Sequence, residues 1–169
     1  MISLYPKSFS DQYEIKHMTQ EDVEEIYEFC LTNPQYYDFC GSELTKESII
    51  KDLSITPPNI TLEDKYYVGF YKNDVLMAVL DLIAGYPDET ICFIGFFMIS
   101  GRKANSGMGT AIIENLCDYL KSCGFTSVQL AYEISNPQAS HFWIKNGFSM
   151  IREVKNESGH LIVGEKVLS

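Results

Sequence analysis

Residues 90 to 124 constrain the fold of this chain most. They begin with a nearly continuous apolar stretch, TICFIGFFMI, which is typical of a strand buried on both faces. The glycine-containing stretch Ser106–Thr110 follows, and apolar residues then recur at helical spacing from 112 to 123. Gly124 stands where a left-handed residue ends many helices. The sequence therefore predicts a strand, a glycine loop and an amphipathic helix in direct succession.

Hydrophobic patterns predict the remaining elements. Thr19 and Asp22 have the spacing of a capping box at the start of a helix, and Asn136 followed by Pro137 is typical of another helix start. The stretch after Pro34 is expected to be a connector. The predicted strands are 13–18, 65–71, 75–85, 127–133 and a final hairpin over 148–168, with short helices after residues 19, 48 and 136. This order indicates an α/β or α+β fold in a single domain over residues 1–169.

Composition and charge exclude several functions. The chain has 169 residues and a formal net charge of −10, which argues against a nucleic-acid partner and favours small cationic substrates. Its five cysteines include no C-x-x-C pair and its three histidines are far apart, so we expect neither disulfides nor a metal site. No apolar stretch is long enough to span a bilayer and the N-terminus does not resemble a signal peptide. We therefore expect a cytoplasmic protein without a membrane partner.

The glycine loop could bind an anion, because glycines before a helix allow backbone N–H groups to converge on a phosphate. An ATP or GTP P-loop requires a lysine after its last glycine, and Thr110 follows Gly109 directly. A dinucleotide fold requires a third glycine where Ile112 stands, although Glu133 could serve as its ribose-binding acid. The P-loop is excluded, and a dinucleotide site remains a minor alternative.

Two stretches together carry a family resemblance. FIGFFMISGRKANSGMGTAIIENL followed by VQLAYEISNPQASHFWIKNGF resembles the GNAT family, the GCN5-related N-acetyltransferases. The resemblance implies a central mixed, mostly antiparallel sheet flanked by helices on both faces. It also implies binding of acetyl-CoA, with the pyrophosphate on the loop and the pantetheine arm paired with a strand. The implied cofactor-binding residues are Phe97, Met98, Ile99, Ala104, Asn105, Ser106, Gly107, Met108, Gly109, Thr110, Asn136, Phe142 and Trp143.

Two positions depart from the family pattern. Ala104 stands where the family usually has Arg or Gln, which removes a side chain and leaves the backbone donors. Trp143 stands where many members have a tyrosine that protonates the departing thiolate, and an indole N–H is no practical acid. A thiol with a pKa near ~8.5 can leave as the thiolate without that proton.

The resemblance implies direct attack of a neutral amine on the thioester. A carboxylate facing the cleft usually accepts the amine proton, and the candidates are Asp81 and Glu133. Tyr36, Tyr37 and Asp38 lie in the connector that flanks the acceptor side in this family, where aromatic and acidic groups suit a cation. The expected acceptor is the amine of a small molecule or a peptide, and a homodimer is left open. A non-catalytic acyl-CoA-binding module and an NAD-dependent oxidoreductase remain as alternatives.

Overall fold

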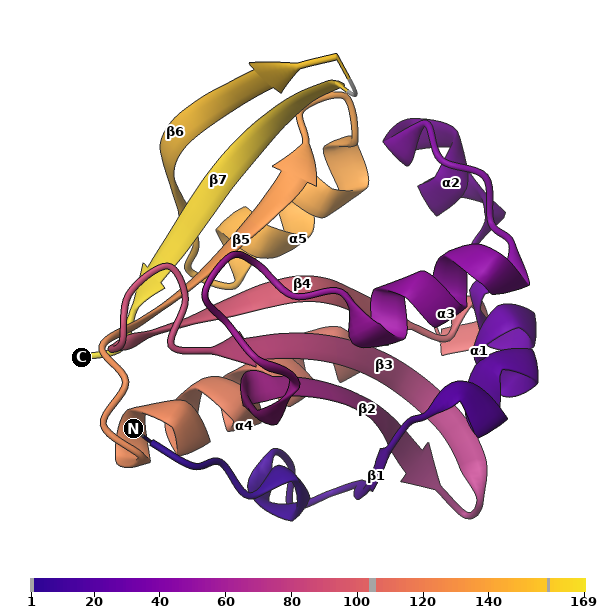
Figure 1. Cartoon of the computed structure of the whole chain (residues 1–169), viewed down its shortest axis with the longest axis horizontal. Coiled ribbons are helices and arrows are strands. Elements are labelled where there is room, and N and C mark those ends of the chain that lie inside the picture. Colours follow the sequence, from indigo (N-terminus) through magenta and orange to yellow (C-terminus); the bar gives the residue numbers. More distant parts are fainter. Residues whose placement is uncertain (1, 104–105, 158) are drawn as a thin grey trace.

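One seven-stranded sheet organises the chain. The computed structural model describes residues 2–103, 106–157 and 159–169. The strand order is β1-β2-β3-β4-β5-β7-β6, and all neighbours are antiparallel except β4 and β5 (Figure 1). The strands are β1 Glu14–His17, β2 Lys65–Lys72, β3 Val75–Ala84, β4 Ile91–Ile99, β5 Ser127–Glu133, β6 Ser149–Asn156 and β7 Gly159–Val167. The mixed, mostly antiparallel sheet implied by the sequence is confirmed.

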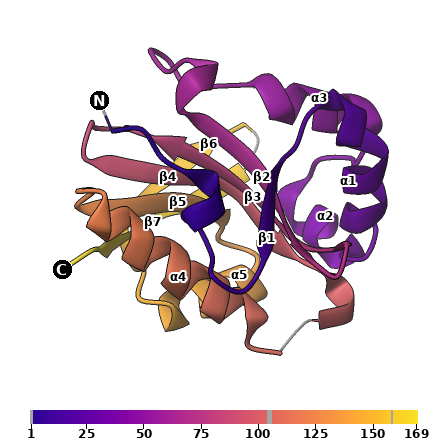
Figure 2. The same cartoon turned by 90° about the horizontal axis from the view of Figure 1, so that it is seen from below.

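Helices cover both faces of this sheet. The α-helices are α1 Val23–Cys30, α2 Pro34–Cys40, α3 Lys46–Ser54, α4 Met108–Ser122 and α5 Pro137–Lys145, and short 3-10 turns lie at Pro6–Ser8, Gln20–Asp22, Leu62–Asp64 and Gly101–Lys103. The two groups α4–α5 and α1–α3 lie on opposite sides of the sheet (Figure 2). Within the described residues, no helix is both long and apolar enough to cross a membrane.

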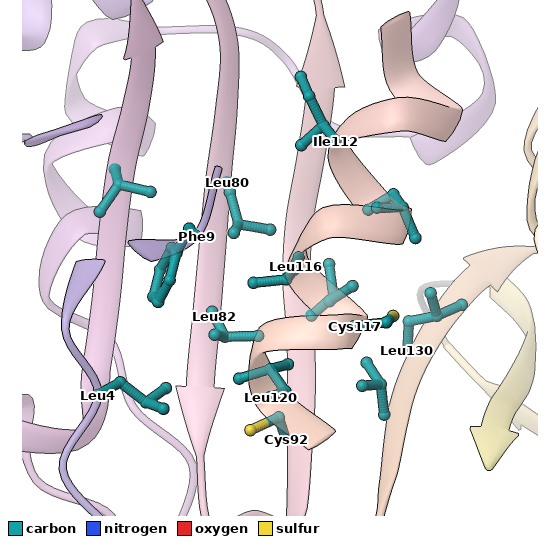
Figure 3. Packing of buried hydrophobic residues seen from close by; sticks show 14 of the residues in the cluster. Leu4, Phe9, Leu80, Leu82, Cys92, Ile112, Leu116, Cys117, Leu120 and Leu130 are labelled. Atoms are coloured by element: carbon teal, nitrogen blue, oxygen red, sulfur yellow. The ribbon is translucent and has the colours of Figure 1, made fainter. Parts of the chain in front are cut away.

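Each face has its own hydrophobic core. Leu80 and Leu82 of β3 pack with Leu116 and Leu120 of α4 on one face, and all four are fully buried (Figure 3). The opposite face packs against α1 and α3 around residues such as Ile26 and Ile49. We call the first the α4 face of the sheet and the second the α1 face. The amphipathic helix predicted after the glycine loop is therefore confirmed as α4.

The stretch from Pro34 to Cys40 differs from the prediction. The sequence pattern predicts a connector there, and the structure forms helix α2 instead. Proline at a first helical position has a backbone already suited to a helix, and Pro34 occupies that position. Gly41 then ends the helix in the left-handed region with φ 67°. Pro34 thus prevents helix α1 from continuing and is also the first residue of helix α2.

Strand β4 also differs from its prediction of burial on both faces. Its pairing with β5 runs only from Ile91 opposite Ser127 to Ile94 opposite Leu130. Gly95 is exposed, and a register shift against β3 at this point indicates a β-bulge. After Ile94, β4 has no β5 residue paired to its edge. The second half of β4 is therefore only partly buried.

Candidate functional site

A cavity of about 300 Å³ opens where β4 and β5 separate. Helices α2 and α5 and strand β7 complete its wall, and these elements surround the same region in Figure 1. The lining residues are Asn33, Gln35, Tyr36, Phe39, Cys40, Ile94, Gly95, Phe96, Phe97, Met98, Ile99, Leu130, Ala131, Tyr132, Glu133, Asn136, Gln138, Ala139, Phe142, Trp143 and Leu161. The lining includes residues that pack on each of the two cores, such as Phe142 on the α4 face and Tyr36 on the α1 face.

The wall on the α4 face is aromatic. Phe97 and Phe142 stack with ring centroids 6.1 Å apart, and Trp143 lies edge-on to Phe142 at 4.8 Å. Trp143 is buried and also packs against Phe148 at 5.2 Å. The structure thus brings Phe97, Phe142 and Trp143 together, and it places Ile99 in the same wall.

Asn136 joins this wall through the start of α5. Its side-chain Oδ1 accepts a hydrogen bond from the backbone N–H of Ala139 at 3.1 Å, which is the predicted helix cap. Its own backbone N–H donates to the carbonyl of Glu133 at 3.0 Å and closes the turn after β5. Asn136 is buried and lines the cavity, and none of the described residues accepts a hydrogen bond from its side-chain nitrogen.

The glycine loop leads into α4 beside the cavity. Gly107 adopts the left-handed conformation with φ 81° immediately before Met108, the first helical residue. Gly109 is buried, and a Cβ at this position would lie 2.9 Å from the ring of Phe142. Only glycine therefore fits between the first turn of α4 and Phe142. The backbone N–H groups of the first turn of a helix have no partners within the helix, so they are available to an anion.

The other predicted loop residues lie at or outside this turn. Ser106 is exposed, and its hydroxyl donates to the carbonyl of Lys103 at 2.6 Å. Thr110 is half-buried in the first turn of α4. Ala104 and Asn105, which the sequence also assigns to this loop, lie outside the described residues. None of the described loop residues lines the cavity itself.

Of the two predicted bases, Asp81 does not line the cavity. It forms an ion pair with Lys65, whose Nζ lies 2.9 and 2.8 Å from the two carboxylate oxygens. Both side chains are buried, with exposed fractions of 11% for Asp81 and 2% for Lys65. Burial raises the pKa of Asp81 above its ordinary value, and the hydrogen bonds from Lys65 oppose that rise. The carboxylate lies directly beneath the bulge, because a Cβ on Gly95 would be 3.0 Å from Asp81 Oδ2.

Glu133 does line the cavity. It is half-buried at the end of β5, and a Cβ on Gly159 would lie 2.8 Å from its carboxylate. Among the described residues, none donates a hydrogen bond to this carboxylate or forms an ion pair with it. Within the described part of the chain, the Glu133 carboxylate therefore has no competing partner.

The three predicted acceptor residues have different surroundings in the structure. Tyr36 lines the cavity, and its ring lies edge-on to Phe96 at 5.6 Å and to Tyr37 at 5.0 Å. Burial raises the pKa of Tyr36 well above its ordinary value, and the nearby negative charge of Glu133 contributes a smaller increase. Tyr37 packs on the core of the α1 face, and Asp38 is exposed outside the cavity lining. Only Tyr36 of the three borders the cavity.

Several lining residues were missed in the sequence. Phe39 and Cys40 lie in α2 at three and four positions after Tyr36, so they share one face of that helix. This spacing could have indicated one face of a helix in the sequence. The prediction of a connector for this stretch did not use it. Phe96, Tyr132 and Leu161 also line the cavity, and their sequence context resembles that of any buried strand residue. In the described part of the chain, no group of three His, Cys, Asp or Glu residues could hold a metal ion.

Solved structures of other proteins have a similar fold. An acetyltransferase from Thermus thermophilus superposes with a TM-score of 0.75 at 21% identity, covering 99% of this chain and 100% of that chain. The PaiA N-acetyltransferase of Thermoplasma acidophilum in complex with coenzyme A gives 0.66 at 18% identity, covering 91% and 98%. AAC(6')-Ib in complex with paromomycin and acetyl-CoA gives 0.71 at 16%, covering 93% and 94%. These structures share the fold.

A sequence search of curated proteins found no significant match. The family model described as the acetyltransferase (GNAT) family does match, over residues 13–148. This match covers most of the chain, including both stretches that carry the resemblance and every helix and strand that borders the cavity except β7. The chain therefore belongs to the GNAT acetyltransferase family.

Proposed function

We propose that this protein transfers an acetyl group from acetyl-CoA to the amine of a small molecule or a peptide, by direct attack of the amine on the thioester. The observation that carries the proposal is the cavity between β4 and β5, whose lining includes residues of both faces of the sheet. A donor and an acceptor can enter such a cavity from opposite faces and meet inside it.

Three features of the chain fit the donor. Strand β4 has no β5 partner after Ile94, so the open backbone edge at Phe97 and the N–H of Ile99 are available to pair with the pantetheine arm, whereas the Ile99 carbonyl already accepts from Asn33 at 2.9 Å. The first turn of α4 and the loop over Ser106–Thr110 offer backbone N–H groups for the pyrophosphate, and Ala104 and Asn105 are assigned to the same loop by sequence. Asn136, Phe142 and Trp143 form the opposite wall for the arm.

The acetyl-CoA supplies an activated thioester, and the chain supplies position and proton transfer. We assign the stabilisation of the negative charge on the thioester oxygen to the backbone N–H of Phe97, on the edge of β4 that faces away from β3. The N–H of Met98 points to β3 instead, because Met98 and Val79 continue the hydrogen-bonded pairing that Ser100 makes with Met77. Glu133 accepts the amine proton, directly or through water. Asp81 is less suited to this role because Lys65 already occupies both of its oxygens.

The leaving thiolate needs no acid from α5. Trp143 is packed among aromatic rings and its indole cannot protonate sulfur. A free thiol has a pKa of ~8.5, so coenzyme A can depart as the thiolate near neutral pH.

The tryptophan at position 143, where many family members have a tyrosine, favours a second candidate function, a protein that binds acyl-CoA without turnover. The mostly antiparallel sheet does not fit the third candidate, an NAD-dependent oxidoreductase, because a dinucleotide fold requires a parallel sheet.

Thermal unfolding with and without acetyl-CoA tests the proposal first. A ligand at 100 times its Kd stabilises a protein by about 2.7 kcal/mol. For a chain of this length that corresponds to a rise in Tm of roughly 5–10 °C. NAD at the same concentration should leave the Tm unchanged. No shift at millimolar acetyl-CoA would sink the proposal, whereas a shift without turnover of any amine would support the binding module.

A further inference from the structure

The acceptor end of the cavity is chemically different from its donor end. We define it by Tyr36, Phe39, Cys40, Phe96, Glu133 and Leu161. Tyr36 and Phe96 pack on the core of the α1 face, whereas Phe97, Ile99 and Phe142 pack on that of the α4 face. The acceptor end is therefore the opening toward α2.

Glu133 belongs to the acceptor end. Leu130 and Tyr132 of β5 pack on the core of the α4 face, and successive side chains of a strand point to opposite faces. Glu133 thus faces the α1 side, which is also the side on which Tyr36 packs. Leu161 is directly opposite Glu133 in the antiparallel register of β5 and β7, so both side chains share this face.

The acceptor end offers one charge within largely apolar walls. Glu133 is the sole charged side chain among the residues described as lining the cavity. The amide nitrogen of Asn33 is already used, because it donates to the carbonyl of Ile99 at 2.9 Å. Phe39, Phe96 and Leu161 have no polar side-chain atoms. The other polar side chains of the lining, such as those of Gln35, Tyr132 and Gln138, are neutral, so a second ammonium would lose water here without gaining a counter-ion. Hydroxyls beside the apolar side chains of the acceptor end would lack hydrogen-bond partners, and unpaired buried polar groups are costly.

The cavity is also small. Ligand sites commonly occupy ~300–1,000 Å³, and this cavity of about 300 Å³ must hold the thioester end of the donor as well. Only a compact part of the acceptor can therefore enter it.

We propose that the acceptor is a compact primary amine with a single positive charge on an apolar alkyl or aryl body. This inference rests on the acetyltransferase function proposed above and narrows its acceptor. The ammonium pairs with the Glu133 carboxylate and loses a proton to it. The neutral nitrogen then forms a bond to the acetyl carbon, the bond from that carbon to sulfur breaks, and coenzyme A leaves as the thiolate. The nitrogen, which became cationic on attack, gives its second proton to water and becomes the amide, and Glu133 returns its own proton to solvent. The rings of Tyr36 and Phe96 contact the apolar body of the acceptor. Aromatic rings also attract a nearby cation such as the ammonium.

A matched pair of amines provides the test. Hexylamine and 1,6-diaminohexane share the same six-carbon chain and differ by one terminal ammonium. We expect kcat/KM to be at least tenfold higher for hexylamine at saturating acetyl-CoA, and likewise for 2-phenylethylamine over glucosamine. The acetylated amine should be measured by mass spectrometry, because the partly exposed thiols of Cys40 and Cys123 would contribute to the signal of a thiol-detection assay.

A charge introduced at the acceptor end makes the test specific. Phe39→Asp places a second carboxylate beside the acceptor, and it should shift the ratio of kcat/KM for the two six-carbon amines toward the diamine by at least tenfold. Cys40→Asp is the second variant, in case Phe39→Asp fails to fold. Leu62→Asp is the matched control, because Leu62 is exposed in a 3-10 turn outside the cavity lining and its variant should keep the wild-type ratio.

The outcomes separate the two proposals. Preference for the diamine, for glucosamine or for a peptide N-terminus would overturn the acceptor class while leaving acetyl transfer intact. A ratio that stays unchanged in folded, active Phe39→Asp and Cys40→Asp would also overturn it. If acetyl-CoA neither raises the Tm nor is consumed with any amine, the proposed function itself fails.

Discussion

Replacing Glu133 by Gln removes the proposed proton acceptor with little change in shape. Glu133 lines the cavity and has no hydrogen-bond donor among the described residues, so the change breaks no ion pair and should leave folding intact. General-base catalysis typically contributes ~10²–10⁴ in rate. The variant should therefore lose kcat/KM and keep its Tm.

The expected magnitude depends on pH. An alkylamine with a pKa of ~10.4 is neutral in only about one molecule in a thousand at pH 7.4. Without Glu133, the reaction must use that neutral fraction, so we expect a loss of about 10²–10³ in kcat/KM at pH 7.4. The neutral fraction rises tenfold per pH unit, so the ratio of wild type to variant should fall below about 10 near pH 9.5.

Steady-state rates of hexylamine acetylation between pH 6.5 and 9.5 measure this ratio. Glu63→Gln is the matched control, because Glu63 is exposed in the 3-10 turn Leu62–Asp64 outside the cavity lining. A Glu133→Gln enzyme that remains within threefold of wild type at pH 7.4 would refute the assignment. So would a large loss that is the same at every pH, because it would indicate a role in binding or shape.

Three further predictions follow from the packing. Asp81→Asn leaves the buried Lys65 ammonium without its counter-ion, so chemical denaturation should show a loss of about 3–5 kcal/mol in unfolding free energy; a loss of kcat/KM at unchanged stability would instead make Asp81 catalytic. Gly109→Ala forces a methyl group against Phe142 and should cost about 1–3 kcal/mol in a thermal melt, with a smaller Tm shift from acetyl-CoA. Burial raises the pKa of Cys92 to about 12 and of Cys117 to about 11, so at pH 8 both thiols stay protonated and iodoacetamide should label neither in the native protein by peptide mass spectrometry. Labelling of either before unfolding would contradict their burial.

Much of the fold was predictable from the sequence, because its signals are local. The cap of α5 involves Asn136 and the N–H of Ala139, three residues away. The end of α4 depends on Gly124, which adopts φ 102°. Helix α2 was missed although its signal was equally local, since Pro34 can end one helix and begin the next. Local patterns leave that choice to the packing of the surrounding chain.

The site was predicted in part. The resemblance brought Phe97, Asn136, Phe142 and Trp143 to one place, and the structure places all four on the cavity wall. No pattern in the sequence indicated that Lys65 would occupy Asp81, because that pairing depends on the register of β2 against β3. The ion pair with Lys65 makes Asp81 the weaker candidate for the base, whereas the sequence did not distinguish Asp81 from Glu133.

The sequence by itself determined the strand, the glycine loop and the amphipathic helix, since the signal of each is local: a continuous apolar run, glycines that permit a left-handed turn, and apolar residues at helical spacing. The tertiary structure decided where β4 and β5 separate, and thereby which residues face a cavity. The apolar run of β4 predicts a strand buried on both faces, and the strand is instead a half-open wall. A buried strand and a ligand-binding strand need the same apolar residues, and only the position of the neighbouring strand distinguishes them.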